Sequence, residues 1–499
     1  MVIIGGGPCG LTLAQCCSRA GAKVAVLEAE STLGGCHRVR RVSARHSVQN
    51  KQEFVFTEHG PRVYSSSYVV FRMILEDLGL NFFDLFSRYN FTITEINNQT
   101  VWTTLGWGEL FSLTMAFLKI LIQPGFGRDI SVYDFMTSNE FSQQSIELLD
   151  RICRLTDGAT SKDYTLYQFL QLFNQQAFYP LYQPRSPNDK SLFSKWRSVL
   201  ESRGVEFLLD HQVDKLVTTT STSTNELLIS HCVTTNGKRI YGKRFVLAVP
   251  PKPMMQILKN SDAIVRNTFG DYQRLNEWAI ATAYIDYVSV TFHWDTKLDL
   301  GHVYGFPKTE WGIAFIVLTD YMTFDETSSK TVISAAITIS DIASRTSGLL
   351  PDQCDGTRLL QEILTQLRVS FPNLPEPTHS IISPGVEFNT IEKKWRSRDT
   401  AFIATSRQPF LEPTPAAQSP ILNLFNVGTH NGKHLYSFTS IEAAVTNAVS
   451  LSHTLYPEIQ DKYVIKRGVH LSDTMVVGFI ALIIYLYFIY RKPNNVFRE

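Results

Sequence analysis

The start of the chain constrains the fold more than any other stretch. Residues 2–4 form an apolar run typical of a buried parallel strand. Glycines follow at Gly5, Gly7 and Gly10, within the small and apolar residues of a helix, and a second apolar run, KVAVLE, ends in Glu28. A lone GxGxxG is weak evidence. Strand, glycines, helix, strand and acid in this order indicate a nucleotide-binding βαβ unit.

Each position in this unit has a physical role. Gly5 permits the tight turn, Gly7 lets a pyrophosphate approach the backbone, and Gly10 lets helix and strand pack closely. We expect phosphate at the start of the helix, with Pro8 among its contacts, because the helix dipole favours negative charge there. Glu28 is placed to accept hydrogen bonds from ribose hydroxyl groups, and its charge disfavours the extra phosphate of NADP.

Composition narrows the class of protein. The chain has 499 residues, which is too many for one ordinary core and predicts two joined domains. Its hydrophobic content of 44% is that of a packed globular protein, and a net charge of +1 gives no indication of nucleic-acid binding. The seven cysteines form no CxxC pair and no disulfide-like spacing, so we expect reduced thiols and no metal site.

The C-terminal region contains a candidate membrane anchor. Residues 474–490, TMVVGFIALIIYLYFIY, carry no charge, and basic residues lie on both sides. At 1.5 Å per residue this run is about 26 Å long, near the lower limit for crossing a bilayer. The alternative is a buried core helix, but such a helix usually has a polar face. We predict a single-pass anchor, a linker over 456–473, and a catalytic part on the cytosolic side.

A second glycine pair indicates which nucleotide is bound. Gly34 and Gly35 follow Glu28 in the stretch STLGGCHRV. This stretch resembles the second fingerprint of the FAD family that includes flavin amine oxidases, protoporphyrinogen oxidase, phytoene desaturase and UDP-galactopyranose mutase. An arginine often follows the glycines in that family, whereas this chain has Cys36 there. The resemblance therefore implies FAD, with Arg38 as the expected diphosphate contact.

The resemblance recurs along the chain. The stretch TEHGPRVYSS is similar to the Gly-Pro-Arg loop of protoporphyrinogen oxidases, and it implies that Gly60 and Arg62 lie near the flavin ring. GVEFLLDHQVDKLV resembles a strand pair in which Val213 contacts adenine through its backbone. VLAVPP also matches a family strand. LFNVGTHNGKHLYSFTSIEAAV resembles the closing FAD motif, which implies three further contacts, namely Gly428, Ile441 and Glu442.

These segments predict an α/β fold with a Rossmann-like FAD-binding domain and an interleaved α+β substrate domain. The FAD-binding domain is expected over 1–80, 203–255 and 385–455. The substrate domain is expected over 81–202, which shows helical periodicity, and 256–384, which mixes strands with a helix.

The reacting residues are harder to predict, because a flavin accepts electrons without a catalytic side chain. The candidates are His430, Arg62, Tyr287 and Tyr436, with His59, Tyr64 and His434 as further pocket residues. His430 follows the turn at Gly428, and from there its imidazole could donate a hydrogen bond or a proton to flavin or substrate. The alternative for His430 and His434 is a solvated turn.

Three departures from the amine oxidases disfavour simple amine oxidation. Ser440 stands where monoamine oxidases have a tyrosine of their aromatic cage, and no lysine lies in 277–296. No cysteine follows Cys354, so FAD is expected to be non-covalent. We predict a membrane-anchored FAD-dependent oxidoreductase with a small hydrophobic substrate. Two alternatives stay open, a UDP-galactopyranose mutase-like flavoenzyme and an FAD-binding scaffold without catalysis.

Overall fold

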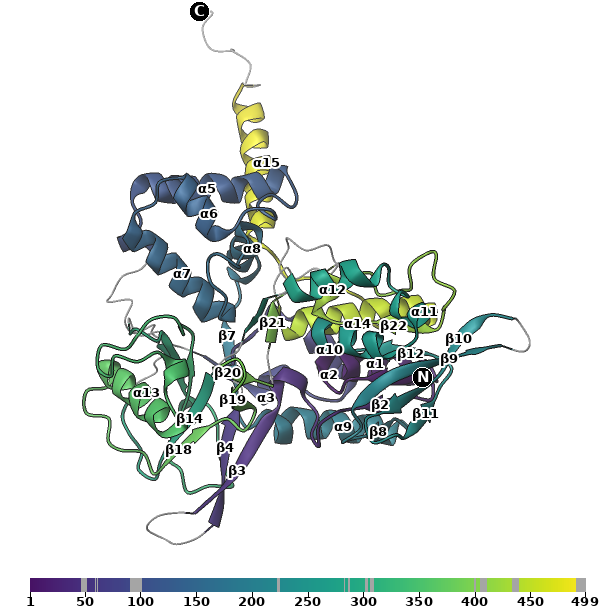
Figure 1. The fold of residues 1–499 in the computed structure, drawn as a ribbon. Helices are drawn as coiled ribbons and strands as arrows, with labels where there is room; N and C mark the ends of the chain where they lie inside the picture. Colours follow the sequence, from purple (N-terminus) through teal and green to yellow (C-terminus); the bar gives the residue numbers. More distant parts are fainter. Residues whose placement is uncertain are drawn as a thin grey trace, which may run out of the picture.

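The computed structural model describes most of the chain. The described residues are 1–45, 52–58, 60, 62–89, 101–221, 225–281, 283–285, 288–300, 304–305, 309–398, 401–403, 411–432 and 439–490. Figure 1 shows the fold, with the helix α15 projecting from one end.

A five-stranded parallel sheet, in the order β22-β12-β1-β2-β8, forms the centre of the first domain. Its strands are β1 (Val2–Ile4), β2 (Ala25–Leu27), β8 (Glu206–Leu208), β12 (Phe245–Leu247) and β22 (Leu424–Asn426). Strands from distant parts of the sequence therefore pair side by side, as with Val2 opposite Phe245. The fold is a mixed α/β fold with a Rossmann-like sheet, as the sequence predicts.

The strand pleat divides the core of this domain into two layers. Ile3 contributes to one apolar cluster, whereas Val2 and Ile4 contribute to another on the opposite face. The first layer holds α1 (Pro8–Arg19), α2 (Val69–Asp77), α9 (Ser194–Ser202) and α14 (Ile441–Leu455). The second holds α10 (Pro251–Asn260), α11 (Ala263–Arg266), α12 (Tyr272–Ala281) and the antiparallel sheet of β9 (Val213–Thr220), β10 (Leu227–Thr234) and β11 (Arg239–Tyr241).

An antiparallel sheet, in the order β15-β16-β17-β14-β18, forms the second domain. Its elements are β14 (Val288–Trp294), β15 (Tyr304–Gly305), β16 (Ile313–Val317), β17 (Thr331–Ile337) and β18 (His379–Ile382), with α13 (Gly356–Ser370) packed on it and the hairpin β19 (Val386–Asn389)–β20 (Lys394–Ser397) beside it. The hairpin β3 (Val39–Arg45)–β4 (Gln52–Glu58) reaches this sheet, where Glu53 pairs with His379 at 2.8 Å. The two domains are thus joined by a polar contact as well as by the chain.

A helical region covers the top of the molecule in Figure 1. It consists of α4 (Val101–Thr104), α5 (Trp107–Ile122), α6 (Val132–Ser138), α7 (Gln143–Asp157) and α8 (Leu166–Gln176). Ser131, Ser142 and Thr165 start α6, α7 and α8, and each side chain accepts a backbone N–H of the first turn. The smaller elements are α3 (Phe82–Leu85), the sheet of β5 (Tyr64–Ser65), β6 (Phe86–Arg88) and β7 (Leu181–Pro184), and the pair β13 (Ala283–Ile285)–β21 (Ala401–Ile403).

The domain boundaries stay a prediction, but each strand of the two five-stranded sheets can be assigned to one of the predicted segments. The parallel sheet takes its strands from 1–80, 203–255 and 385–455, and the five-stranded antiparallel sheet takes its strands from 256–384. Two hairpins are exceptions. The hairpin β3–β4 comes from 1–80 and packs against β14 and β18, and the hairpin β19–β20 comes from 385–455 and packs beside the same antiparallel sheet.

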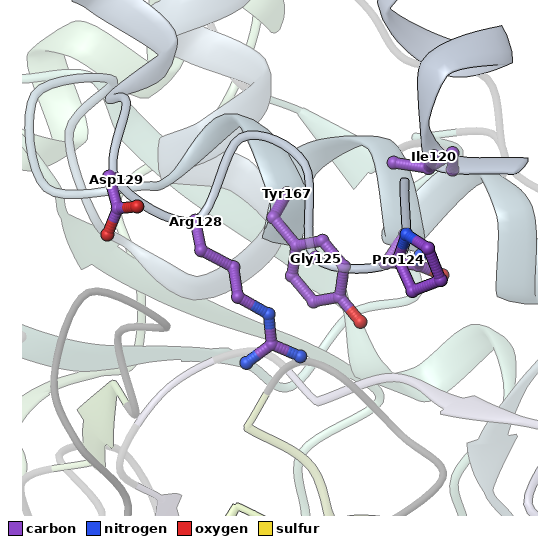
Figure 2. Close-up of a pocket in the computed structure, with 7 residues that line it drawn as sticks. Ile120, Pro124, Gly125, Arg128, Asp129 and Tyr167 are labelled. Carbon is purple, nitrogen blue, oxygen red and sulfur yellow. The ribbon is translucent and has the colours of Figure 1, made fainter. Parts of the chain in front are cut away.

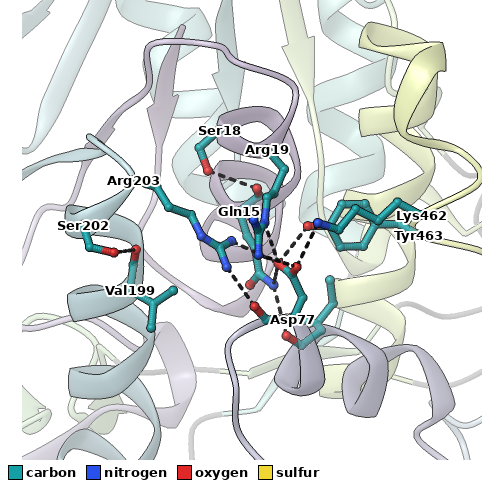
Figure 3. A network of polar contacts seen from close by, with 10 residues as sticks. Gln15, Ser18, Arg19, Asp77, Val199, Ser202, Arg203, Lys462 and Tyr463 are labelled. Atoms are coloured by element: carbon teal, nitrogen blue, oxygen red, sulfur yellow. Dashed lines mark hydrogen bonds and ion pairs between the residues drawn. The ribbon is translucent and has the colours of Figure 1, made fainter.

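Asp77, the last residue of α2, ties four parts of the first domain together (Figure 3). Its carboxylate pairs with Arg19 of α1 at 3.0 Å and with Arg203 after α9 at 3.0 Å. Lys462 and the hydroxyl of Tyr463 reach it from the segment after α14, at 3.2 and 2.8 Å. The carboxylate is only 8% exposed. Burial acts to raise its pKa, but hydrogen bonds from Gln15, Tyr463 and Arg19 hold the pKa well below its ordinary value.

The C-terminal helix α15 (Leu471–Tyr490) begins slightly before the predicted anchor. Among the described residues it is the one helix long and apolar enough to cross a membrane, with a mean hydropathy of 1.9 over Leu471–Phe488 and none of that window buried. Its start is docked on the body, because the N–H of Ser472 donates to the Asn174 side chain at 2.8 Å and that of Val469 to the Tyr179 hydroxyl at 2.6 Å. The alternative of a buried core helix does not describe α15.

Candidate nucleotide and flavin site

Two glycines close the turn between β1 and α1. Gly5 has a φ of +118°, and a Cβ atom there would lie 2.3 Å from the carbonyl oxygen of Ala248, just after β12. A Cβ atom at Gly10 would lie 2.0 Å from the carbonyl oxygen of Gly5. No side chain fits at either position, so these glycines are required by the turn itself.

Gly7 meets the second glycine pair. A Cβ atom at Gly7 would lie 3.6 Å from the Cα of Gly35, and the N–H of Gly34 donates to the carbonyl of Gly6 at 3.0 Å. Gly34 and Gly35 have φ values of +123° and +55°, which favour glycine. The two fingerprints that lie apart in the sequence therefore form one glycine-lined surface.

This surface lies at the open end of a helix. Pro8 is the first residue of α1, and no side chain of the described residues caps the helix. The first backbone N–H groups of a helix have no partner within it, and the helix dipole makes that end positive. An uncapped helix start beside half-buried glycine backbone fits a diphosphate.

Glu28 and Arg38, both predicted to contact the nucleotide, also contact each other. The Glu28 carboxylate accepts the N–H of Gly6 at 2.8 Å and pairs with the Arg38 guanidinium at 3.0 Å, and both side chains are buried. Arg38 also donates to the carbonyl of Thr32. Glu28 thus fixes the glycine loop as well as standing at the end of β2.

The segment that leads to Val213 runs beside Glu28. The N–H of His211 donates to the carbonyl of Glu28 at 2.9 Å, and Val213, the buried first residue of β9, follows. The predicted adenine contact and the predicted ribose contact are therefore neighbours.

The loop predicted to face the flavin joins both domains. Gly60 is buried against β17, where a Cβ atom at Gly60 would lie 3.9 Å from the Cβ of Ala336. Arg62 donates through its side chain to the carbonyl of Cys36, directly after the second glycine pair. Its own carbonyl accepts a hydrogen bond from the side chain of Gln183 in β7.

Glu58, at the end of β4, is buried next to this loop. Burial raises its pKa to about 7, and the neighbouring Arg62 and Ser334 act in the opposite direction. The carboxyl group therefore titrates near neutral pH. The sequence alone gives no sign of this, because the burial of Glu58 depends on β17 of the other domain.

His430 has a more enclosed setting than a solvated turn. It is 2% exposed, and its Nε2 lies 3.1 Å from the Asn426 side-chain oxygen. Its ring meets the edge of Trp278 with 6.0 Å between centroids. Burial lowers the pKa of His430 to about 3, so the imidazole is neutral at physiological pH. A Cβ atom at Gly428 would lie 2.5 Å from the His430 ring, so a side chain there would force the imidazole to move.

Glu442, in the first turn of α14, joins this helix to the start of α2. The two oxygens of the Glu442 carboxylate accept the N–H groups of Val70 and Phe71, each at 2.8 Å, at the beginning of α2. Burial raises the pKa of Glu442 to about 8, although these backbone donors favour the charged form. Ser440 caps α14 by accepting the N–H of Ala443, and Ile441 is buried in the α1 layer.

Several predicted residues cannot be placed. Tyr287, Tyr436, His59 and His434 lie outside the described residues. No group of three or more histidine, cysteine, aspartate or glutamate side chains with metal-binding geometry occurs in the part of the chain that the structure describes.

Two hollows lie away from the glycine surface. One, of about 450 Å³, lies between the end of α5 and α8, where the Arg128 guanidinium stands 4.3 Å from the Tyr167 ring centroid (Figure 2). The other, of about 690 Å³, lies between α7 and the second sheet and is lined by Arg151, Arg154 and Glu310 among others. Neither hollow contains a residue predicted from the fingerprints.

Comparisons with known proteins agree with this arrangement. A family model described as an NAD(P)-binding Rossmann-like domain matches residues 3–78. A structure of putrescine oxidase bound to putrescine is 14% identical, with a TM-score of 0.62 over 91% of this chain and 98% of that chain. Cyclohexylamine oxidase from Brevibacterium oxydans IH-35A is 12% identical, with a TM-score of 0.56 over 92% and 99%. No curated protein matches the sequence.

The fold and the glycine surface define a protein with a Rossmann-like nucleotide-binding domain joined to a second, mainly antiparallel domain. The chain shares the fold of these two amine oxidase structures, and the resemblance expected from the sequence is confirmed for the fold.

Proposed function

We propose that the chain is an FAD-dependent oxidoreductase anchored in a membrane. The observation that carries this proposal is the meeting of Gly7 and Gly35 at the uncapped start of α1, with Glu28 fixed beside them. Glycine backbone without side chains at the start of a helix suits a diphosphate, and an acid at the end of the second strand suits a ribose.

The residues present fit FAD, and each has a role in holding it. The start of α1 binds the diphosphate with Arg38 nearby, Glu28 binds the ribose, and the backbone of Val213 contacts adenine. Gly60, Arg62, Gly428 and the start of α14 would contact the flavin part of the cofactor. Binding is non-covalent, since no cysteine follows Cys354 in the sequence. When bound, FAD supplies an acceptor for a hydride or for electrons.

The protein's own part in the reaction is to orient the substrate and to hold protons. Glu58 can hold or release a proton at its carboxylate near neutral pH. Arg62, Tyr287 and Tyr436 stay candidates for contact with the substrate. His430 contributes as a neutral imidazole bonded to Asn426, which suits positioning better than proton donation.

A small hydrophobic substrate follows from the anchor. We propose that α15 crosses the bilayer once and keeps the body at the cytosolic surface, where apolar compounds partition from the lipid. The cysteines support a reducing compartment, since all seven are free and all except Cys36 are buried.

The test is to purify the full chain in detergent and to record its absorbance before and after acid precipitation. A flavin spectrum that moves to the supernatant supports non-covalent FAD. Reduction of that flavin by amines, polyunsaturated lipids or porphyrinogens would then identify the substrate class, whereas turnover of UDP-sugars only after dithionite treatment would favour the mutase-like alternative. A folded, colourless chain that takes up no FAD would refute the proposal and favour a scaffold.

A further inference from the structure

Helix α5 (Trp107–Ile122) is apolar on two opposite faces. Its inner face contributes Ala116 and Ile120 to the core of the helical region. Its outer face carries Trp107, Phe111, Met115 and Ile122, which are 89, 65, 39 and 86% exposed. We call these four residues the outer stripe.

The spacing of the outer stripe puts its members on one side of the helix. Trp107, Phe111 and Met115 are four residues apart, and Ile122 lies about three turns beyond Phe111. Soluble proteins rarely expose a continuous apolar surface of this kind without a partner. An ordinary surface helix has one apolar face, which packs on the core, so a second apolar face indicates a second contact with protein or with lipid.

The outer stripe lies at the same end of the molecule as α15. α5 and α8 share one apolar core, and α8 packs against α15. In Figure 1, α5 runs across the direction of α15 near the base of that helix. Two more exposed aromatic side chains, Phe173 in α8 and Phe178 just after it, lie in the same segment that receives the start of α15.

We propose that the outer stripe of α5 lies in the surface of the lipid bilayer into which α15 inserts. This inference rests on the proposed anchoring of α15. At 1.5 Å per residue α5 is about 24 Å long, too short to cross a bilayer, and its crosswise direction suits a helix lying in the membrane plane. Trp107 is the residue type enriched at the membrane–water interface, and Lys119 beside the stripe can reach the headgroups.

A bilayer fits this surface better than a protein partner does. The stripe lies on a helix that shares a core with α8, and α8 packs against α15, which has the composition of a membrane span. A protein partner would have to cover α5 next to that span. The body is then held by two contacts, one across the membrane and one along it.

The experiment places a nitroxide label in the full chain, reconstituted into phosphatidylcholine vesicles with some phosphatidylserine. Labels at Phe111→Cys and Ile122→Cys test the stripe. Ile483→Cys tests α15, and Ile391→Cys, between β19 and β20, is the matched exposed control. The parent chain treated with the same reagent gives the background from native cysteines. Accessibility to oxygen and to a water-soluble nickel complex is measured for each label.

We expect labels 111 and 122 to be several-fold less accessible to nickel than label 391 while remaining accessible to oxygen, as in lipid. High nickel accessibility at 111 and 122, with label 483 in lipid, overturns the inference and leaves the anchor intact. Low accessibility to both agents means that protein covers the stripe, which also overturns it. If label 483 is itself accessible to nickel, the proposed anchoring fails and the inference fails with it.

Discussion

The carboxylate of Glu28 accepts a 2.8 Å hydrogen bond from the backbone N–H of Gly6, in the middle of the glycine loop. The same carboxylate pairs with Arg38. The acid at the end of β2 therefore supports the glycine loop, and it lies between the proposed ribose and diphosphate positions.

The Glu28→Gln variant tests this support. We expect FAD binding to weaken roughly tenfold or more, corresponding to about 1.4 kcal/mol, because the ion pair with Arg38 is lost. Fluorescence titration of the apoprotein with FAD measures the change. The control is Glu30→Gln, which removes a partly exposed pair with Arg40 and leaves the loop intact. Equal affinities in the two variants would contradict the role of Glu28.

Substitution of Gly7 should affect FAD binding, whereas substitution of Gly10 should affect the stability of the fold. A methyl group at Gly7 meets only ordinary contact distances, so Gly7→Ala should fold normally but lose FAD, and Gly7→Val should bind none. A methyl group at Gly10 clashes with the backbone of Gly5, so Gly10→Ala should lower stability by roughly 1–3 kcal/mol. Flavin content and thermal unfolding distinguish the two effects. A Gly7→Val protein with full flavin content would show that the cofactor binds elsewhere.

Glu58 should make stability depend on pH near neutrality. Its pKa is raised from 4.5 to about 7, so the folded state binds a proton that the unfolded state has released. Stability should therefore fall as pH rises from about 4.5 to 7, by roughly 3 kcal/mol in total, since each pKa unit corresponds to about 1.4 kcal/mol. Denaturant unfolding of wild type and Glu58→Gln measures the difference. Glu387→Gln, an exposed change, should leave the pH profile unaltered.

Asp77, unlike Glu58, should stabilise the protein at neutral pH and lose this effect in acid. Asp77→Asn leaves Arg203 and Arg19 without their charged partner, and we expect a loss of roughly 3–5 kcal/mol at neutral pH. Because the pKa of Asp77 is lowered from 3.8, the advantage of wild type should disappear as pH falls below that value. Thermal unfolding across pH checks this, with exposed Glu76→Gln as control. A constant difference between variants across the acid range would argue against the ion pairs.

The parts of the site that could be predicted are those whose requirements are local. Gly5 and Gly10 are needed by a single turn, and Glu28 follows a single strand, so the residue pattern predicts their positions. The Rossmann-like fold follows from these motifs, because β1, β2 and β12 are short apolar runs and Gly5 comes directly after β1.

The remaining features depend on elements that meet only after folding. His430 owes its enclosed setting to Asn426 and Trp278, and Glu58 owes its burial to the second sheet. Periodicity likewise predicts that α5 is a helix, but it does not show which of its two apolar faces another element covers. The sequence therefore predicts the nucleotide half of the site better than the substrate half.

The segment between α14 and α15 is not a flexible linker. Lys462 and Tyr463 are fastened to Asp77, and Val469 and Ser472 are fastened to Tyr179 and Asn174. Because these contacts fix the segment at two places, a rotation or tilt of α15 would rotate the folded body with it. The surroundings that determine the tilt of α15 would therefore also determine the orientation of the domain that contains Asp77.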